Sequence, residues 1–321
     1  MGSHGWLTEG DCRTLCLFRE AVAGISPLAD STCAVQRLAM VPLLLEGSPE
    51  QRELWLPPAR VGEAMGAFAM TEPEAGSDVA NIQTLARLVE GGYRLNGLKH
   101  LISNAGIADF YVVFASLDPS RGSRGIGAFL VPATSPGLHF VGPQVLSAPH
   151  PLGRLELRDC PADLICSEGF KLGMRTLDTV RVSVAAAACG MAGEALRQAL
   201  AYVQQRRQFG KPLADFQLVQ ARLAQMATGL EAARLLTYRA AWQRDHGELR
   251  NTSEVAMAKA FATETAQQVV DSAMQLLGGQ GMLADHPVEH LYRAVRSLRI
   301  YEGTTEIQQL IIAKELLRAA P

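Results

Sequence analysis

The sequence has little surplus of either charge and no uninterrupted apolar run long enough to cross a membrane. Its 321 residues carry 30 Lys and Arg against 32 Asp and Glu, a formal net charge of −2. Nucleic-acid binding depends mainly on contacts between basic side chains and phosphates. Because the sequence has no excess of basic residues, we expect no nucleic-acid partner. No apolar run reaches the roughly 18 residues of a membrane span, and no secretory signal opens the chain. We therefore expect a globular protein of the cytoplasm with no membrane partner.

The sequence also lacks the cysteine and histidine spacings of metal sites. None of the 6 cysteines forms a CxxC pair, and no histidine-rich cluster follows Cys12 and Cys16, which lie one helical turn apart. His286 and His290 are four residues apart, but Pro287 argues against a continuous helical face between them. We expect buried free thiols in a reducing compartment and no bound metal.

The apolar residues repeat with a helical period at both ends of the chain. Residues 5–67 look helical and include a short helix that starts at Gly47-Ser48-Pro49 and runs through Gln51 to Leu56, where Pro57-Pro58 should break it. Residues 167–321 predict four helices with mostly short connections, which is typical of a helix bundle. The first of these helices is expected over 172–205, and the second from Phe216 onward. The third should run from Asn251, with Glu254 completing a capping box, to Gly278-Gly279. The last should start at about Thr305, with its apolar side formed by Ile307, Leu310, Ile311 and Leu317.

Residues 68–166 have the shorter period of β-strands. Apolar runs at 111–117 and 126–131 flank a polar loop, and 154–157 continues the pattern. The dipeptide Asn96-Gly97 lies between two short strand-like runs, which predicts a tight hairpin. This zone predicts a small antiparallel β domain, so the expected fold class is mainly α with a middle β domain.

Four segments contain the residue types that chemistry needs. In chain order they read TEPEAGSD (71–78), RRQFGKPL (206–213), QLLGGQG (275–281) and IYEGTTEIQ (300–308). Each segment alone also fits a structural explanation, such as a polar loop, a helix stop or an acidic residue at a helix start.

Together the four segments resemble the acyl-CoA dehydrogenase family, in its order and at compatible spacings, from about residue 33 to the C-terminus. The resemblance implies a helical N-terminal domain, a middle β domain and a C-terminal four-helix bundle, with FAD held between the last two. It also implies a homodimer or homotetramer, because the neighbouring subunit completes the flavin site. The electron acceptor expected for the family is an electron-transferring flavoprotein.

The resemblance assigns cofactor positions residue by residue. Beside the flavin ring it places Phe68, Met70 and Thr71, with Ser103 where the family has a threonine near flavin N5 and Leu101 where it usually has a tryptophan. Arg206 matches the arginine that pairs with the FAD pyrophosphate of the adjacent subunit. The other implied cofactor positions, along the pyrophosphate, ribose and adenosine, are Ser77, Phe209, Phe216, Gln217, Gln275, Gly278, Gly279, Thr304 and Glu306.

The resemblance makes Glu302 the catalytic base. It would remove the α-proton of an acyl thioester while a hydride passes from the β-carbon to flavin N5, and a positioned base is worth roughly 10²–10⁴-fold in rate. Burial against flavin and substrate should raise the pKa of this carboxyl. The implied substrate positions are Ser77, Asp178, Arg181, Tyr301 and Gly303, with coenzyme A or an acyl carrier protein as the carrier.

The sequence departs from the family in several places, among them the bulkier Thr179 and Val180 before Arg181. The helices that family members usually have before the region matching Arg13–Leu45 are absent, Leu101 replaces the tryptophan, and the stretch Val145–Arg154 is shorter than usual. Two alternatives therefore stay open beside the dehydrogenase. One is a flavin oxidase or monooxygenase on the same fold, and the other is a non-catalytic subunit of a hetero-oligomer.

Overall fold

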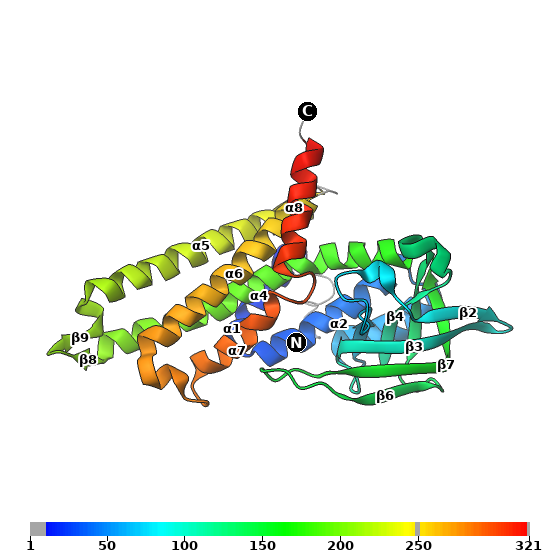
Figure 1. Ribbon diagram of the computed structural model, residues 1–321, viewed down its shortest axis with the longest axis horizontal. Coiled ribbons are helices and arrows are strands. Elements are labelled where there is room, and N and C mark those ends of the chain that lie inside the picture. Colours follow the sequence, from blue (N-terminus) through cyan, green and yellow to red (C-terminus); the bar gives the residue numbers. More distant parts are fainter. Residues whose placement is uncertain (1–10, 248–250, 320–321) are drawn as a thin grey trace. The chain divides into compact units, whose positions relative to one another are not determined.

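Helices occupy both ends of the chain and strands its middle, so the expected fold class is confirmed (Figure 1). The computed structural model describes residues 11–247 and 251–319; the expected domain ends at 5–10 and 320–321 lie outside them. Contacts divide the chain into two compact units, one of Ser31–Val180 and one of Asp11–Asp30 with the residues from Arg181 onward. The unit boundaries fall inside the helices α2 (Pro27–Glu46) and α4 (Gly169–Gln205).

In the first unit, α3 (Pro49–Val61) extends further than the sequence indicates. Ser48 and Gln51 form a capping box at its start, and the helix continues through Pro57 and Pro58 to a left-handed Gly62. The expected break at the prolines is wrong. Because Glu53 and Leu54, the residues whose carbonyls lose their N–H partners, are exposed, solvent can replace the missing bonds.

A seven-stranded sheet forms the middle of the chain. Its path β1-β4-β2-β3-β7-β5 closes through an additional β4–β5 pairing, and β6 pairs with β7. Most pairs are antiparallel, as expected, while β1 and β2 run parallel to β4. The strands are β1 (Gly66–Ala69), β2 (Leu85–Val89), β3 (Gly92–Ser103), β4 (Phe110–Ser116), β5 (Ile126–Pro132), β6 (Leu138–Pro143) and β7 (Leu152–Cys166), with the 3₁₀ helices η2 (Val79–Asn81) and η3 (Pro119–Gly125) between them.

The hairpin expected at Asn96-Gly97 lies elsewhere. The two-residue turn is Glu90-Gly91, which joins β2 to β3, and Gly91 has a φ of +88°. Asn96 and Gly97 lie inside β3 at a register shift against β7. A Cβ on Gly97 would come within 2.4 Å of the Thr84 hydroxyl, so this glycine permits close approach rather than a turn.

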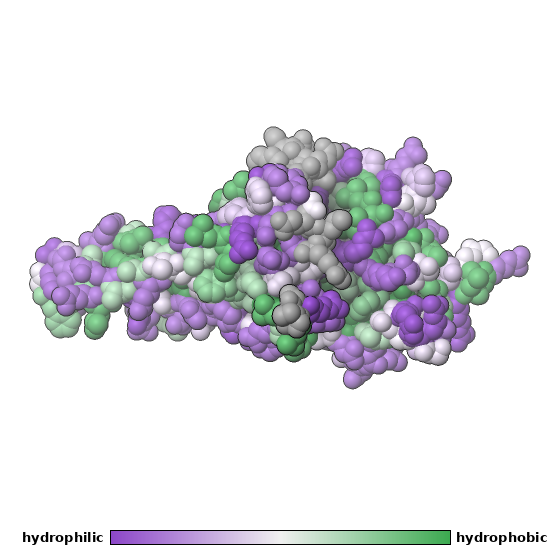
Figure 2. Space-filling view, turned by 90° about the horizontal axis from the view of Figure 1, so that it is seen from above, coloured by the Kyte–Doolittle hydropathy of each residue, from purple (hydrophilic) through white to green (hydrophobic). Residues whose placement is uncertain are grey.

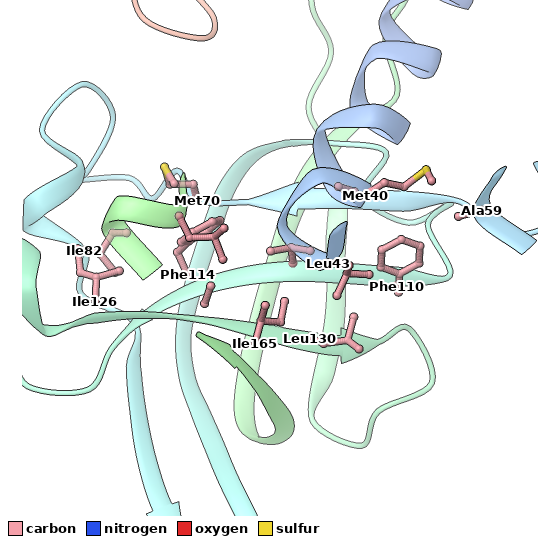
Figure 3. Close-up of a cluster of buried hydrophobic side chains, with 14 of the residues drawn as sticks. Met40, Leu43, Ala59, Met70, Ile82, Phe110, Phe114, Ile126, Leu130 and Ile165 are labelled. Atoms are coloured by element: carbon pink, nitrogen blue, oxygen red, sulfur yellow. The ribbon is translucent and has the colours of Figure 1, made fainter. Parts of the chain in front are cut away.

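The core of the first unit lies between α2 and the strands. Figure 3 shows Leu43 of α2 near Phe110, Leu130 and Ile165 of the sheet, and Met40 from the same helix. By length and composition α2 is the one helix in the described residues that would suffice to cross a membrane. Its apolar side chains pack in this core, and its Gln36 bonds the carbonyls of Ala59 and Ala64.

Helices build the second unit. The expected helix stop at Gly278 is confirmed, but Asn251 forms no side-chain cap and instead donates to the Ala240 carbonyl. A helix beginning at Pro287 was not expected; His286 caps it, and proline is favoured at a first helical position. The elements are α1 (Cys12–Ile25), the later part of α4, β8 (Arg207–Gln208), β9 (Lys211–Pro212), η4 (Leu213–Asp215), α5 (Gln217–Asp245), α6 (Thr252–Leu277), η5 (Gly278–Met282), α7 (Pro287–Leu298) and α8 (Thr305–Ala319).

The first helix is fixed tightly to the bundle. A Cβ on Gly190 of α4 would meet the Glu20 carbonyl of α1 at 2.0 Å, so only glycine allows this crossing. Glu20 also accepts bonds from Arg234 and Tyr238 of α5. These contacts hold α1, and with it Arg19, at a defined place in the second unit.

Apolar side chains remain exposed on several bundle helices, among them α5 and α8. On α8 the expected apolar side is not buried within the unit, since Leu310 is 66% and Leu317 77% exposed. Leu218 on α5 is 87% exposed. The surface view shows hydrophobic areas between hydrophilic ones (Figure 2). Part of the apolar side of α8 therefore faces solvent in the single chain.

Candidate active site

Glu302 lies in a short loop between α7 and α8 whose backbone is strained. Glu302 has a φ of +54° and Gly303 a φ of +92°. A non-glycine residue in the left-handed region costs about 1–3 kcal/mol and persists where the surroundings enforce it. The glutamate conformation is therefore imposed by the contacts of the loop.

Three buried side chains donate to the two carbonyls of this loop. The Arg181 Nε donates to the Glu302 carbonyl at 2.9 Å, and the Lys259 Nζ donates to the Gly303 carbonyl at 2.6 Å. Gln308 Nε2 donates to both carbonyls. Since the donors come from α4, α6 and α8, three helices fix the position of one loop.

A glutamate of α6 holds the residues on either side of the loop. Glu264 Oε1 accepts a bond from Arg299 Nε at 2.7 Å and another from the Thr305 hydroxyl at 2.7 Å. Thr304, the residue directly before α8, accepts the Ile307 N–H with its hydroxyl. Lys259 and Glu264 lie outside the four motif segments, because their importance depends on where α6 places them.

The Glu302 carboxyl group is buried and incompletely paired. Its Oε2 atom is buried without a hydrogen-bond partner in the described part of the chain, and its backbone N–H likewise has no acceptor there. Burial raises the pKa of this carboxyl, and the nearby cations Arg19, Arg181 and Lys259 partly oppose the rise. An unpaired carboxylate oxygen beside an unpaired N–H offers one acceptor and one donor to a bound molecule.

In the first unit a buried ion pair organises the segment that contains Thr71. Lys99 Nζ lies 2.7 Å from Glu72 Oε1 and also donates to the carbonyls of Met70 and Phe114. Glu72 in turn accepts the backbone N–H groups of Gln83 and Thr84. This pair fixes the chain on both sides of Met70 and Thr71, which the resemblance places beside the flavin.

The other ring positions of the resemblance lie at the end of β3 and on β1. Leu101 is 45% exposed with a φ of +54°, and its N–H donates to Gln144. Ser103 Oγ lies 2.7 Å from His150 Nε2, and His150 Nδ1 lies 3.0 Å from Ser31 Oγ. Phe68 packs against Phe114, with ring centroids 4.8 Å apart. His150 thus occupies the shortened stretch before β7 and binds the hydroxyl expected near the flavin.

We expect His150 to make the stability of the protein depend on pH. Burial lowers the pKa of His150, so the unfolded chain takes up a proton near pH 6.5 while the folded chain resists it. Stability should therefore fall as the pH drops below about 6.5. In thermal unfolding between about pH 7.5 and pH 5.5, the midpoint of the wild type should fall further than that of His150→Asn. Equal falls in the two proteins would contradict this role.

The hairpin of β8 and β9 presents an aromatic side chain to solvent. Phe209 and Gly210 form its two-residue turn, both with positive φ, and Phe209 is 92% exposed. Its ring lies edge-on to Phe216, with centroids 6.2 Å apart, and Lys211 Nζ lies 4.2 Å from the Phe216 ring centroid. A strained, exposed phenylalanine is unfavourable in isolation and suits a surface that binds a planar group.

Two further features of the second unit fit a large anionic cofactor such as FAD. The Arg206 side chain is exposed and makes no ion pair or hydrogen bond with any described residue. Gly278 and Gly279 have no atom within 4 Å of where a Cβ would lie, so a ligand can approach their backbone. An unpaired guanidinium can bind a pyrophosphate through charge-assisted hydrogen bonds, and an open glycine pair lets a flat ring lie against the backbone.

The Arg206 region and the Glu302 loop are far apart in one chain. At roughly 1.5 Å per residue, the end of α4 at Gln205 lies about 36 Å from Arg181. The structure thus brings Arg181, Tyr301, Glu302 and Gly303 together but keeps Arg206, Phe209, Phe216 and Gln217 at the other end of the helix (Figure 1). The remaining expected positions, Ser77, Gln275 and Glu306, are exposed, while Asp178 and Thr304 are partly buried.

The chain matches two family models that together cover most of it. Residues 67–160 match the middle domain of acyl-CoA dehydrogenase, and residues 167–317 match its C-terminal domain. The chain therefore belongs to the acyl-CoA dehydrogenase family, whose members are FAD-dependent oxidoreductases acting on a CH–CH group.

Two relatives show how the similarity extends along the chain. It is 42% identical to the 3-(aryl)acrylate reductase of Clostridium sporogenes, over 86% of this chain and 75% of that protein. It is 43% identical to the human mitochondrial short-chain specific acyl-CoA dehydrogenase, over 88% of this chain and 70% of that protein.

Solved structures give the same fold. Butyryl-CoA dehydrogenase from Megasphaera elsdenii has a TM-score of 0.93 at 36% identity, covering 97% of this chain and 83% of that chain. A structure described as the electron transferring flavoprotein of Acidaminococcus fermentans has a TM-score of 0.96 at 35% identity, covering 99% and 88%. PigA with FAD and proline has a TM-score of 0.93 at 30% identity, covering 99% and 88%.

Proposed function

We propose that the protein oxidises the α,β bond of an acyl thioester, with Glu302 removing the α-proton. The observation that carries the proposal is the buried Glu302 Oε2 atom, which has no partner in the described residues. A buried polar atom without a partner is unfavourable unless it has a role or a missing ligand. A substrate C–H group directed at this oxygen would supply that role.

The unpaired Glu302 N–H is the second part of the proposed mechanism. Removal of the α-proton moves negative charge to the thioester oxygen, and a donor placed at that oxygen is worth about 3–4 kcal/mol. Both the unpaired N–H and the unpaired carboxylate oxygen belong to one residue of this strained loop. One residue would thus serve as base and as oxygen donor.

The raised pKa of Glu302 sets the pH dependence of the reaction. The base must be ionised, and burial raises its pKa above the ordinary 4.5. The rate of α-proton removal should therefore be lost as the pH falls through this raised value, rather than below pH 4.5. A single-turnover rate that stays constant down to about pH 4.5 would contradict the assignment.

When bound, FAD accepts the hydride from the β-carbon. In the second unit Gly278 and Gly279 would leave room for an adenine, and Arg206 and Phe209 would also bind FAD. The distance along α4 favours the FAD of a neighbouring copy for Arg206, because Arg206 lies too far from Glu302 of its own chain to bind the cofactor there. The exposed apolar residues of α5 and α8 support a homo-oligomer.

We expect Arg206→Gln to weaken FAD binding. A charge-assisted hydrogen bond contributes about 1.5–3 kcal/mol, so the dissociation constant should rise roughly 10- to 150-fold. Titration of apoprotein with FAD, followed by flavin fluorescence, measures it. The matched control is Arg318→Gln on α8, which breaks only an exposed pair with Glu315. Equal affinity of Arg206→Gln and this control would remove Arg206 from the cofactor site.

The proposed reaction is tested by mixing the purified yellow protein with a short-chain acyl-CoA without oxygen. Bleaching of the flavin absorbance supports a dehydrogenase, and re-oxidation by an electron-transferring flavoprotein would identify its acceptor. Rapid re-oxidation by air with peroxide formation would instead indicate an oxidase, to which Leu101 in place of tryptophan would give oxygen access. No bleaching with any acyl thioester would leave the non-catalytic subunit as the better explanation.

A further inference from the structure

One histidine joins two serine hydroxyls within the first unit. His150 Nε2 lies 2.7 Å from Ser103 Oγ at the end of β3, and His150 Nδ1 lies 3.0 Å from Ser31 Oγ on α2. Burial lowers the pKa of His150, so the ring is neutral at neutral pH. Each nitrogen of a neutral ring thus has one serine hydroxyl as its partner.

The backbone on both sides of this contact is fixed. A proline stands directly before and directly after His150, and each restricts the conformation of the chain. The Asn104 N–H donates to the Pro151 carbonyl at 2.7 Å, and Ser103 pairs with Leu152 in the sheet. The imidazole and the Ser103 hydroxyl are therefore held together by the backbone of two adjoining segments.

The position of the ring hydrogen decides what the Ser103 hydroxyl can do. A neutral imidazole has one N–H and one lone pair, so it can donate to only one of the two serines. If Nε2 carries the hydrogen, Ser103 accepts it and keeps its own O–H for another acceptor. If Nδ1 carries the hydrogen, Ser31 accepts it and the Ser103 O–H is bound to the ring.

The cofactor expected beside Ser103 needs a donor. Members of the family bind FAD, and the resemblance places Ser103 near flavin N5, which in the oxidised ring has a lone pair and no hydrogen. The end of β3 also contacts Thr71, the other hydroxyl assigned to the ring, because the His100 N–H donates to the Thr71 carbonyl at 2.9 Å. One short stretch of β3 thus connects both assigned hydroxyl positions.

We propose that His150 is a positioning residue for the flavin site: its Nε2–H holds the Ser103 oxygen, so that the Ser103 O–H is directed to the oxidised ring. With Nε2 protonated, Nδ1 accepts from the Ser31 hydroxyl, and this bond fixes the tautomer. His150 acts only through Ser103. The inference rests on the FAD site of the proposed function, but not on Glu302 or on a substrate.

Two substitutions of His150 separate its two hydrogen bonds. The amide of His150→Gln reaches the place of Nε2, so FAD affinity should stay within about twofold of the wild type. The amide of His150→Asn lies near Nδ1 and loses Ser103, so the dissociation constant of oxidised FAD should rise roughly 2- to 10-fold, as for one neutral hydrogen bond. In a Ser103→Ala background, His150→Asn should have no further effect. The matched control is His139→Asn, at an exposed position on β6, which should leave FAD affinity unchanged.

Titration of apoprotein with FAD at about pH 8, where His150 is neutral, measures these dissociation constants. The midpoint potential of the bound flavin is measured in parallel. His150→Asn should make this potential less negative, because the lost donor serves only the oxidised ring, whereas reduced flavin carries an N–H that can still donate to Ser103. A purely structural role of His150 would weaken both forms of the cofactor alike and leave the potential unchanged.

Non-additive losses in His150→Asn and Ser103→Ala, together with a less negative potential in His150→Asn, would support the proposal. Additive losses, an unchanged potential, or a His150→Gln affinity as low as that of Ser103→Ala would overturn it. Bleaching of the same holoproteins by an acyl-CoA reports the proposed function separately. Non-additive FAD affinities without bleaching would refute the dehydrogenase but support the role of His150, whereas bleaching with additive affinities would overturn only the role of His150.

Discussion

Glu302→Gln should reduce the rate of flavin bleaching by an acyl thioester roughly 10²–10⁴-fold while FAD stays bound. Glutamine retains the size and the hydrogen-bonding capacity of glutamate but cannot take up the α-proton. The contacts that hold the loop come from the backbone carbonyls of Glu302 and Gly303, so they should survive the substitution. Anaerobic stopped-flow absorbance with one acyl-CoA measures the rate, and the flavin spectrum reports FAD occupancy.

A matched control separates the base from other carboxylates of the same region. Glu315→Gln changes an acid on α8 that pairs only with Arg318 at the surface, and it should bleach at the wild-type rate. Glu302→Gln should also be at least as stable as the wild type at neutral pH, because the raised pKa means that ionised Glu302 opposes folding. A normal bleaching rate in Glu302→Gln would show that another group removes the proton.

Lys99→Met should destabilise the protein by about 3–5 kcal/mol, because it leaves a buried carboxylate without its cation. Lys99 and Glu72 are 0% and 3% exposed, so water cannot replace the lost partner. For a unit of this size the thermal midpoint should fall by roughly 10 °C. Differential scanning calorimetry measures the change.

The double variant Lys99→Met with Glu72→Gln is the control for the buried charge. A neutral glutamine can still accept the N–H groups of Gln83 and Thr84, so most of the lost stability should return. In the wild type burial opposes ionisation of Glu72, but Lys99 outweighs it and lowers the pKa of Glu72. The stability from the pair should thus be present above about pH 4.5 and be lost as the pH falls further. Additive losses in the double variant would contradict this account.

The sequence predicts the parts of the fold that depend on local period. The strands β4 and β5 lie within one residue of the expected runs because both are continuously apolar. The hairpin was misplaced because Asn96-Gly97 has the composition of a turn, whereas Glu90-Gly91 adopts one. Two predictions that rested on proline as a helix breaker were wrong. A helix continues through Pro57-Pro58, and another helix begins at Pro287.

For the candidate site, too, the sequence predicts contiguous residues better than contacts between distant segments. The motif around Glu302 is contiguous, so its residues can be recognised along the chain. The groups that control the glutamate come from distant segments: Lys259 bonds Gly303 across 44 positions, and Arg181 bonds Glu302 across 121. Neither Arg19 nor His150 belongs to a recognisable motif, and their partners are set by how helices and strands pack. Such residues become visible only in the folded chain.

Exchange of α-hydrogens in deuterium oxide tests the central claim most directly. An arylacetyl thioester has α-hydrogens but no β-hydrogens, so it can lose an α-proton to the base while hydride transfer is impossible. Mass spectrometry should find deuterium at the α-carbon with the wild type, with a rate that falls as the pH drops through the raised pKa of Glu302. Glu302→Gln should show none above the uncatalysed rate. Equal exchange in both proteins would contradict the assignment of Glu302 as the base.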